Sequence, residues 1–278
     1  MIGVALETAA RELKAISDSA TLDAELLLAH ILRIDRGNLR ARYEHSLSSA
    51  DAEYFNQLIS RRRGGEPLAY LLGRREFWSL SFKVTPAVLV PRPESELLVE
   101  CGLQAVANIA QPSVLDLGTG SGAIGLSLAH ELPHATVVAA DISPQALAVA
   151  EDNRRALGLG NARTVLSDWF EAIPDEIFDL IVSNPPYLAN KDPHLATGHL
   201  AAEPIQALVS GKTGLEAYQV IAPRAMGHLK VGGTLLLEHG NTQASAVCTI
   251  LHTCGYTKIT TFRDLAGHER ATRAHKPS

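Results

Sequence analysis

The feature that most limits how this chain can fold is the alternation of short apolar runs with longer helical stretches from about residue 95 onward. The apolar runs read SVLDL, TVVAAD, ARTVLS, FDLIVSN and GGTLLLEHG, and two final strands follow at YTKITTF and residues 268–274. The helical stretches lie at 122–132, 143–157, 214–229 and 242–254. Strands that are apolar throughout are buried on both faces, so the pattern predicts an α/β fold with a mainly parallel seven-stranded sheet.

The first 72 residues follow another pattern, with apolar side chains at helical spacing and no strand signal. Ser48, followed by Asp51, predicts the start of a helix that stops at Gly64-Gly65. Residues 73–90 alternate aromatic and β-branched side chains with polar ones, which is typical of a short hairpin. We therefore expect a helical domain at 1–72, a hairpin linker at 73–90 and an α/β domain at 91–278.

Composition and charge restrict the classes of function. With 278 residues, 46% of them hydrophobic, the chain can bury a core in each of two domains. A net charge of -5 is unlike the basic balance of proteins that coat nucleic acid. Three cysteines without a CxxC pair and eleven scattered histidines predict neither a disulfide framework nor a metal site. No apolar run approaches the ~18 residues that span a bilayer, and the acidic, amphipathic start is unlike a signal peptide, so we expect a cytoplasmic protein.

Candidate binding residues stand where strands end, because parallel sheets bind ligands at the carboxyl ends of their strands. The first strand runs into a glycine-rich loop that lets the backbone approach a ligand closely. The loop candidates are Asp116, Gly118, Thr119, Gly120, Ser121 and Gly122. Gly120, Gly122 and Gly125 also satisfy the GxGxxG spacing of dinucleotide-binding loops, so an NAD site and a simple tight turn are alternatives.

The next two strands end in side chains that suit an adenosine group. At the end of TVVAAD, the Asp141 carboxylate can accept hydrogen bonds from both ribose hydroxyls. At the end of ARTVLS, Asp168 can accept from an adenine amino group and Trp169 can cover the base, although Asp168 alone would also serve as a helix cap. Asp116 favours S-adenosylmethionine over NAD, because a carboxylate attracts a cationic methionine group and repels a pyrophosphate. In this respect DLGTGSG resembles the loop of Rossmann-like class I methyltransferases.

The fourth strand ends in Asn184, Pro185, Pro186 and Tyr187, the strongest chemical signal in the chain. Proline has no N–H, so this strand end offers acceptors with few competing donors. The Asn184 side chain and the Pro185 carbonyl can accept both hydrogens of an NH2 group on an sp² carbon, and Tyr187 can pack on the flat group. Orientation then supplies most of the catalysis, with Asn184, Pro185 and Tyr187 as catalytic candidates and all four residues as substrate-binding candidates. The exocyclic amines of adenine and guanine suit the same geometry, and a plain turn is a further alternative.

Over essentially its whole length the chain resembles the HemK/PrmC family, the glutamine N5-methyltransferases of peptide chain release factors. The resemblance rests on RRRGGEPLAYLLGRREFWSLSFKV, VPRPESE, DLGTGSGAIGLSLA, VVAADISPQALAVAEDN, SDWF, SNPPY, AAEPIQAL and DLAGHER. It implies a class I methyltransferase domain, with S-adenosylmethionine as methyl donor and S-adenosylhomocysteine as product. It also implies that Gly118 to Gly122, Asp141, Trp169 and Asn184 contact the cofactor. Residues 184–187 would then hold the glutamine of a Gly-Gly-Gln loop.

The resemblance leaves relatives with other substrates open. A glutamine methyltransferase of a large-subunit ribosomal protein has a different PRP segment, and an adenine N6 DNA methyltransferase is a more distant alternative. A noncatalytic adaptor is disfavoured because the glycine loop and NPPY are both intact. Ser95 stands where the family usually has threonine, and it keeps the hydroxyl. The expected partner is a release factor, bound by a monomeric enzyme without direct contact to nucleic acid or membrane.

Two further groups of residues are candidates for contact with the protein substrate. Arginines cluster in the helical domain, where they can meet an acidic partner or form an ordinary solvated face. They are Arg33, Arg36, Arg40, Arg42 and Arg61 to Arg63. Glu203 and Pro204, in the loop after NPPY, are candidates for the wall of the glutamine pocket.

Overall fold

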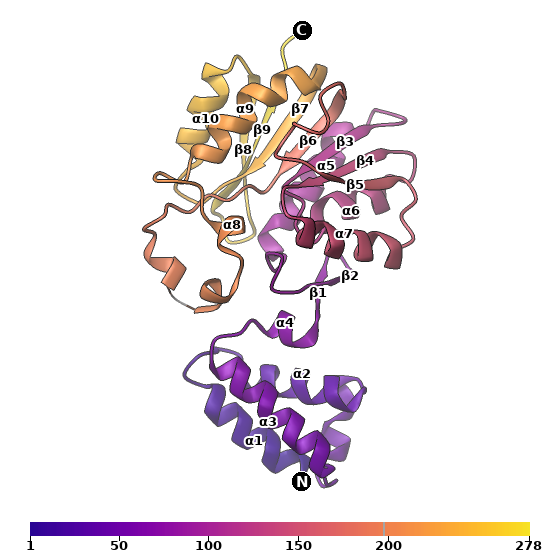
Figure 1. Cartoon of the computed structure of the whole chain (residues 1–278), viewed down its shortest axis with the longest axis vertical. Coiled ribbons are helices and arrows are strands. Elements are labelled where there is room, and N and C mark those ends of the chain that lie inside the picture. The colour runs from indigo at the N-terminus through magenta and orange to yellow at the C-terminus, as the bar shows by residue number, and fades with distance from the viewer. Residues whose placement is uncertain (197) are drawn as a thin grey trace. The chain divides into compact units, whose positions relative to one another are not determined.

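The computed structural model describes every residue of the chain except Thr197. Two compact units are present, and each has a hydrophobic core of its own (Figure 1). The first unit comprises Met1–Arg74 and Pro193–Ala202, and the second comprises Arg75–Asp192 and Glu203–Ser278. No helix formed by the described residues combines the length and the apolar character that crossing a bilayer requires.

The N-terminal unit is a small helical assembly. It contains α1 (Ile2–Leu13), α2 (Ala20–Leu32), α3 (Ser49–Arg63) and α4 (Leu68–Leu72), with the 3-10 turns η1 (Arg36–Asn38) and η2 (Arg40–Arg42) between α2 and α3. The helices meet around Leu13, Leu27 and Leu28, which are fully buried. Helix α3 begins where the sequence predicts, because the Ser48 hydroxyl accepts a hydrogen bond from the Asp51 N–H at 3.1 Å.

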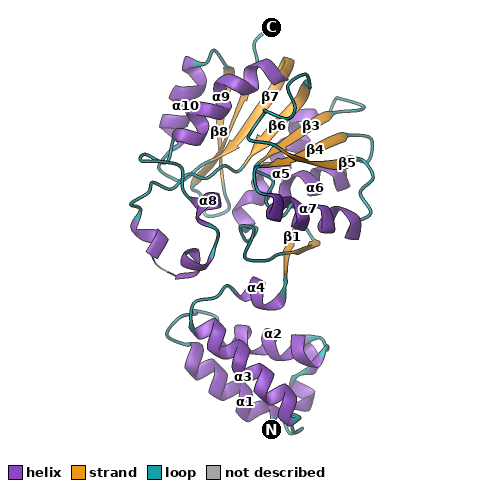
Figure 2. Cartoon of the chain, viewed as in Figure 1, coloured by secondary structure: helices purple, strands orange, loops and turns teal. Residues whose placement is uncertain are grey.

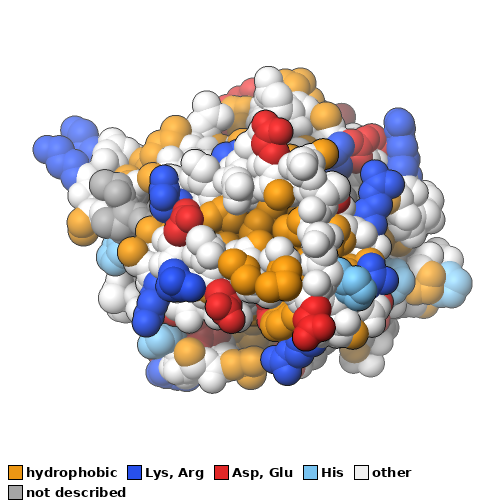
Figure 3. Space-filling model, turned by 90° about the horizontal axis from the view of Figure 1, so that it is seen from below, with side chains coloured by type: hydrophobic (Ala, Val, Ile, Leu, Met, Phe, Trp, Pro, Cys, Tyr) orange, Lys and Arg blue, Asp and Glu red, His pale blue; other side chains and the backbone are white. Residues whose placement is uncertain are grey.

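Ion pairs within this unit engage part of the arginine set, although Arg36, Arg61 and Arg63 stay about half exposed. Four of the candidate arginines are paired with acids of the same unit. The pairs are Arg36–Glu25 at 2.8 Å, Arg61–Glu66 at 2.6 Å, Arg62–Asp23 at 2.9 Å and Arg63–Glu12 at 3.4 Å. Arg62 and Asp23 are both buried, so this pair joins α3 to α2 and faces no partner. Figure 3 shows one face of the molecule, where Lys and Arg side chains stand apart from one another with acidic side chains between them.

The second unit is built on a sheet in which the described residues form seven strands, as the sequence predicts. The strands are β3 (Ser113–Leu117), β4 (Thr136–Asp141), β5 (Ala162–Leu166), β6 (Phe178–Ser183), β7 (Leu229–Glu238), β8 (Thr257–Arg263) and β9 (Glu269–His275). Their order in the sheet is β5-β4-β3-β6-β7-β9-β8. The strands β5, β4, β3, β6 and β7 run parallel to one another, and β9 runs antiparallel to both β7 and β8. The prediction of a mainly parallel sheet is confirmed.

Helices cover both faces of the sheet (Figure 2). They are α5 (Glu96–Val106), α6 (Ala123–Glu131), α7 (Pro144–Ala156), α9 (Glu216–His228) and α10 (Ala244–Thr253). Shorter elements lie in the connecting segments: the helix α8 (Ile205–Leu208) and the 3-10 turns η3 (Pro93–Ser95), η4 (Pro193–Ala196) and η5 (Gly198–Ala202). Side chains of α5 and α6 share one core with the sheet, and those of α9 and α10 share the other. No helix was predicted at 96–106 from the sequence, so α5 is an element that only the structure shows.

A hairpin precedes the sheet, as the residue alternation predicts. It pairs β1 (Arg74–Phe77) with β2 (Leu80–Lys83) through Trp78 and Ser79, whose φ angles of 52° and 58° suit a tight type I′ turn. Phe77 and Phe82 meet edge to face with ring centroids 6.2 Å apart, and both are buried in the core that α5 and α6 share with the sheet. The hairpin is therefore part of the packing of the second unit.

This packing predicts different stabilities for two fragments. A fragment of residues 73–278 keeps both cores of the second unit and is expected to unfold in one cooperative transition. A fragment that starts at Ser79 lacks Phe77, and loss of a buried phenylalanine costs about 3–5 kcal/mol. Urea titration followed by circular dichroism should therefore give the shorter fragment a lower free energy of unfolding. Equal values would contradict the placement of β1 in this core.

Candidate active site

The middle strands of the sheet bring their carboxyl ends together. Strand β3 pairs in parallel with β4 on one side and β6 on the other, so Leu117 lies beside Ala140 and Ser183. The ends are tied across the strands, since the N–H groups of Gly118 and Thr119 both donate to the Ala140 carbonyl at 2.9 Å. Residues that follow these strands are thereby delivered to one edge of the sheet.

A cavity lies at this edge, and most of the predicted site residues line it. From the predicted set its wall contains Gly118, Thr119, Gly120, Ser121, Asp141, Asp168, Trp169, Asn184 and Pro186. Asp116, Gly122, Pro185 and Tyr187 are not part of the wall. The structure therefore gathers residues from four strand ends, and it separates those that face the cavity from those that support it.

The glycine-rich loop has a backbone that side chains would disturb. Gly118, Gly120 and Gly122 have φ angles of 70°, 56° and 86°, a region that L-residues other than glycine rarely adopt. A Cβ atom on Gly122 would also lie 2.6 Å from a methyl carbon of Leu126 in α6. Asn153, buried in α7, donates to the Ser121 carbonyl at 2.8 Å. The loop is thus held by the helices on either side of it.

Asp116 supports the loop from beneath. It is 1% exposed, and its Oδ2 accepts hydrogen bonds from the Thr119 hydroxyl at 2.6 Å and the Gly125 N–H at 2.9 Å. Burial raises the pKa of Asp116 to about 6. Its Oδ1 is buried without a hydrogen-bond partner among the described residues. The carboxylate therefore stands behind the wall, where its charge lies close to the loop without contact with the cavity.

Asp141 has both a structural and a cavity-facing position. Its Oδ2 accepts from the Gly120 N–H at 2.8 Å, and its Oδ1 accepts from the Ser143 N–H at 2.9 Å. Burial raises the pKa of Asp141, although these backbone hydrogen bonds oppose the rise. A carboxylate oxygen can accept more than one hydrogen bond, so both oxygens retain capacity toward the cavity.

Trp169 lies over the loop from the end of β5. Its backbone is in the left-handed region at φ 50°, and the Ser167 hydroxyl donates to its carbonyl at 2.9 Å. A Cβ atom on Gly118 would lie 4.0 Å from the indole ring, which locates the ring beside the glycine backbone. The side chain therefore offers a flat apolar face next to the loop and Asp168.

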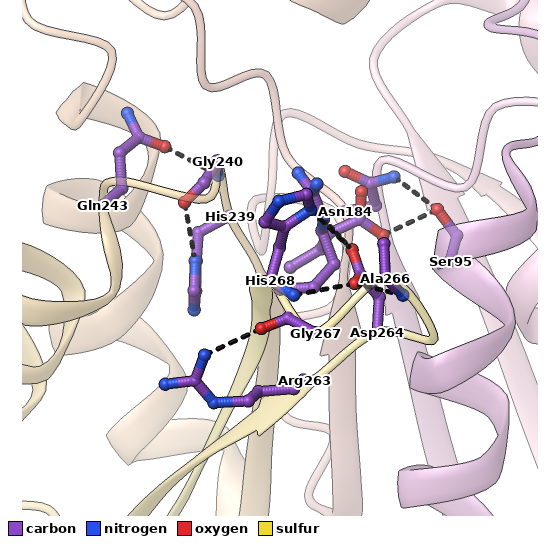
Figure 4. A network of polar contacts seen from close by, with 12 residues as sticks. Ser95, Asn184, His239, Gly240, Gln243, Arg263, Asp264, Ala266, Gly267 and His268 are labelled. Atoms are coloured by element: carbon purple, nitrogen blue, oxygen red, sulfur yellow. Dashed lines mark hydrogen bonds and ion pairs between the residues drawn. The ribbon is translucent and has the colours of Figure 1, made fainter.

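Asn184 lies at the opposite wall of the same cavity, where its side chain is held by hydrogen bonds (Figure 4). Its Nδ2 donates to the Ser95 hydroxyl at 3.1 Å, and that hydroxyl donates to the Glu238 carboxylate at 2.6 Å. The Ser183 hydroxyl, one residue earlier, donates to the Leu117 carbonyl at 2.7 Å. The NPPY segment is therefore fixed to β3 at its first end.

Tyr187 anchors the other end of NPPY. Its N–H donates to the Leu208 carbonyl at 3.2 Å, and its own carbonyl accepts from Gln243 Nε2 at 2.9 Å. Burial raises the pKa of Tyr187 to about 12, so its hydroxyl stays protonated at neutral pH. Tyr187 is part of the support of the segment and cannot act as a base there.

Of the two candidates in the loop after NPPY, one lines the cavity and the other does not. Pro204 lines the cavity, as expected. Glu203 does not, because it is buried, accepts from the Val90 N–H at 3.1 Å and forms an ion pair with Arg92. Arg92 itself lines the cavity, a position that sequence analysis missed. The PRPESE segment was the available signal for Arg92, but its partner lies 111 residues away.

Comparisons with known proteins agree with the two-part organisation of the chain. The model described as PrmC N-terminal domain matches residues 4–73, and the Methyltransferase small domain matches residues 93–213. A release factor glutamine methyltransferase of Xylella fastidiosa is 47% identical over 92% of this chain and 93% of its own. The proteins of that name from Vibrio cholerae and Escherichia coli are 45% and 43% identical, covering 98% and 92% of this chain and 95% and 92% of their own.

Solved structures share the fold at lower identity. A methyltransferase from Pyrococcus furiosus has a TM-score of 0.54 at 17% identity, covering 80% of this chain and 100% of its own. A 16S rRNA methyltransferase from T. thermophilus, in complex with AdoMet and guanosine, has a TM-score of 0.54 at 22% identity, covering 73% of this chain and 49% of its own. These likenesses support the Rossmann-like methyltransferase fold of the second unit.

The close approach of Gly214 to NPPY generates a prediction. A Cβ atom on Gly214 would lie 2.3 Å from the Tyr187 carbonyl oxygen, whereas one on Gly158 would meet nothing within 4 Å. Both glycines have positive φ, so alanine at either position incurs a conformational cost of about 1–2 kcal/mol. Gly214→Ala should lower the free energy of unfolding by about 1–3 kcal/mol more than Gly158→Ala does, as measured by urea denaturation. Equal losses would mean that Gly214 does not constrain the segment.

Proposed function

The chain belongs to the family of release factor glutamine methyltransferases, and we propose that it methylates the side-chain amide nitrogen, N5, of the Gly-Gly-Gln glutamine in peptide chain release factors. One observation carries the proposal: Asn184 and Pro186 line the same cavity as the glycine-rich loop and Asp141. A substrate nitrogen held at Asn184 and Pro186 would therefore face a ligand held by the glycine-rich loop and Asp141.

S-adenosylmethionine is the methyl donor in this proposal, and it leaves as S-adenosylhomocysteine. When bound, it supplies an electrophilic methyl group. Asp141 accepts from the ribose hydroxyls, and Asp168 and Trp169 hold the adenine. Asp116 would attract the positive charge of a methionine group from behind the loop, and the backbone of residues 118–122 would border that group. The donor set of the cavity thus fits this cofactor, while the loop lacks a basic residue for a pyrophosphate.

The substrate amide is held by acceptors. Asn184, which lines the cavity, would accept one hydrogen of the glutamine NH2 through Oδ1. The carbonyl of Pro185, a residue that lies behind the wall, would accept the other only if the substrate reaches between Asn184 and Pro186, and the two acceptors together would direct the nitrogen lone pair toward the methyl group. Asn184 Nδ2 is already engaged with Ser95, so its oxygen is the free end of the amide. The C–S bond of the sulfonium donor would break as the C–N bond forms, and the nitrogen would then release one proton to solvent, so no strong base is required before the transfer. Orientation by fixed groups can supply roughly 7–11 kcal/mol of the barrier reduction.

The choice of a release factor rests on the relatives, whose identity of 43–47% extends over nearly the whole chain. A net charge of -5 gives no general attraction for DNA, which disfavours the adenine reading. A ribosomal-protein glutamine is the nearer alternative, because its NH2 group is the same. We propose that a single copy suffices, since the cavity residues all come from one unit of one chain, and that it works in the cytoplasm with the translation machinery.

Cofactor binding provides the first test of this function. Asp141→Ala removes charge-assisted hydrogen bonds worth about 1.5–3 kcal/mol each, so it should weaken S-adenosylmethionine binding at least tenfold by calorimetry. Asp152→Ala is the matched control, because Asp152 is half-exposed on α7, pairs with Lys83 and does not line the cavity. Tight binding of NAD to the unaltered protein would contradict the assignment.

The substrate is tested with labelled cofactor offered alongside several acceptors. We expect one methyl group on an intact release factor, and none when its Gly-Gly-Gln glutamine is replaced by glutamate, which has no NH2. Large-subunit ribosomal proteins and duplex DNA are the parallel samples. Label in DNA but not in release factor would overturn the proposal. Label confined to a ribosomal protein would instead assign the chain as a glutamine methyltransferase of that protein.

A further inference from the structure

The Asn184 amide has a buried hydroxyl and a buried carboxylate beside it: Ser95 lines the same cavity as Asn184, and Glu238 lies behind it. Ser95 ends η3 and Glu238 ends β7, and their side chains are 3% and 2% exposed. The Ser95 hydroxyl joins them to the site, since it donates to Glu238 Oε2 at 2.6 Å and accepts from Asn184 Nδ2 at 3.1 Å. Figure 4 shows Ser95 and Asn184, which are far apart in the sequence, side by side at this point.

The direction of these hydrogen bonds is determined by the groups themselves. An ionised carboxylate only accepts, so it takes the single hydrogen of the Ser95 hydroxyl. The lone pairs of that hydroxyl can then only accept, and the NH2 end of the Asn184 amide meets them. An amide oxygen and an amide NH2 have nearly the same shape, so hydrogen bonds decide which way the group points.

We propose that Ser95 and Glu238 are positioning residues that turn the Asn184 amide so that its oxygen faces the substrate nitrogen. The inference rests on the proposed function, in which this oxygen accepts a hydrogen of the glutamine NH2. A reversed Asn184 would present its own NH2 to the substrate NH2. Two donors would then face each other, one acceptor of the pair would be lost, and the nitrogen lone pair would no longer be directed at the methyl group.

The surroundings of Glu238 make the arrangement sensitive to protonation. Burial raises the pKa of Glu238 to about 7, against the lowering effects of Ser95, Arg270 and Asn184. The titratable or charged groups that face it are Arg270 from β9, Glu94 from η3, Tyr187 after β6 and Tyr218 from α9. A protonated Glu238 can donate to Ser95, which frees the serine hydrogen for the Asn184 oxygen and permits the reversed amide. Turnover should therefore fall as the pH drops below about 7.

The serine is tested by a pair of substitutions with opposite expectations. Ser95→Ala removes the link and should reduce kcat about 100-fold, the order of loss caused by a misplaced nucleophile, while calorimetry shows cofactor affinity within a few-fold of the unaltered enzyme. Ser95→Thr keeps the hydroxyl and should retain a kcat close to that of the unaltered enzyme. Ser127→Ala is the matched control, because Ser127 is fully buried in α6 and its hydroxyl has no partner among the described residues.

The carboxylate is tested by Glu238→Gln, which keeps the shape and removes the titration. Its kcat should be lowered and should vary less between pH 6 and 8 than that of the unaltered enzyme. Thermal unfolding of each variant verifies that the fold is kept. Unchanged kcat in Ser95→Ala, failure of Ser95→Thr to retain it, or an unaltered pH profile in Glu238→Gln would overturn the inference. If the unaltered enzyme failed to methylate release factor, the proposed function would be wrong instead, and that result is read before any variant is compared.

Discussion

The parallel pairing of β3 with β4 and β6 is the constraint on which the site depends. These strands are buried on both faces, and a slip of one residue would exchange every side chain between the two cores. The register is reinforced at its functional end, where Ser183 donates to the Leu117 carbonyl and the loop N–H groups donate to Ala140. The glycine-rich loop and NPPY therefore reach the same cavity, because this register places the ends of β3 and β6 side by side.

Carboxylates hold the loops that emerge from this frame, with Asp116 and Glu238 buried and Asp141 partly buried. Asp116, Asp141 and Glu238 each have a raised pKa whose largest cause is burial, so each is maintained against a desolvation cost. Each also accepts hydrogen bonds from a cavity-forming segment or from the side chain beside it. A carboxylate accepts in several directions at once, which suits it to fixing a loop that has no regular secondary structure.

The sequence predicted the parts of the fold whose causes are local. Strands β3 to β6 were found within about one residue, because continuous apolar runs between turn signals mark strands buried on both faces. The start of α3 followed from Ser48 and Asp51 for a similar reason. Helix α5 was not predicted, because its apolar residues follow the proline-rich PRPESE segment without a clear signal for a helix N-terminus.

Contacts between segments that are far apart in the chain could not be predicted from the sequence. Ser95 and Glu238 are 143 residues apart, and Arg62 and Asp23 are 39 apart, so no local pattern reports either pair. For this reason the sequence reported neither the burial of Arg62 in an ion pair nor the carboxylate of Glu238 beside Asn184. The candidate residues that line the cavity are those that follow strand ends, a position that the sequence pattern reveals. Which way their side chains point depends on what lies behind them, and two acceptors can select an NH2 group only when that orientation is fixed before the substrate arrives.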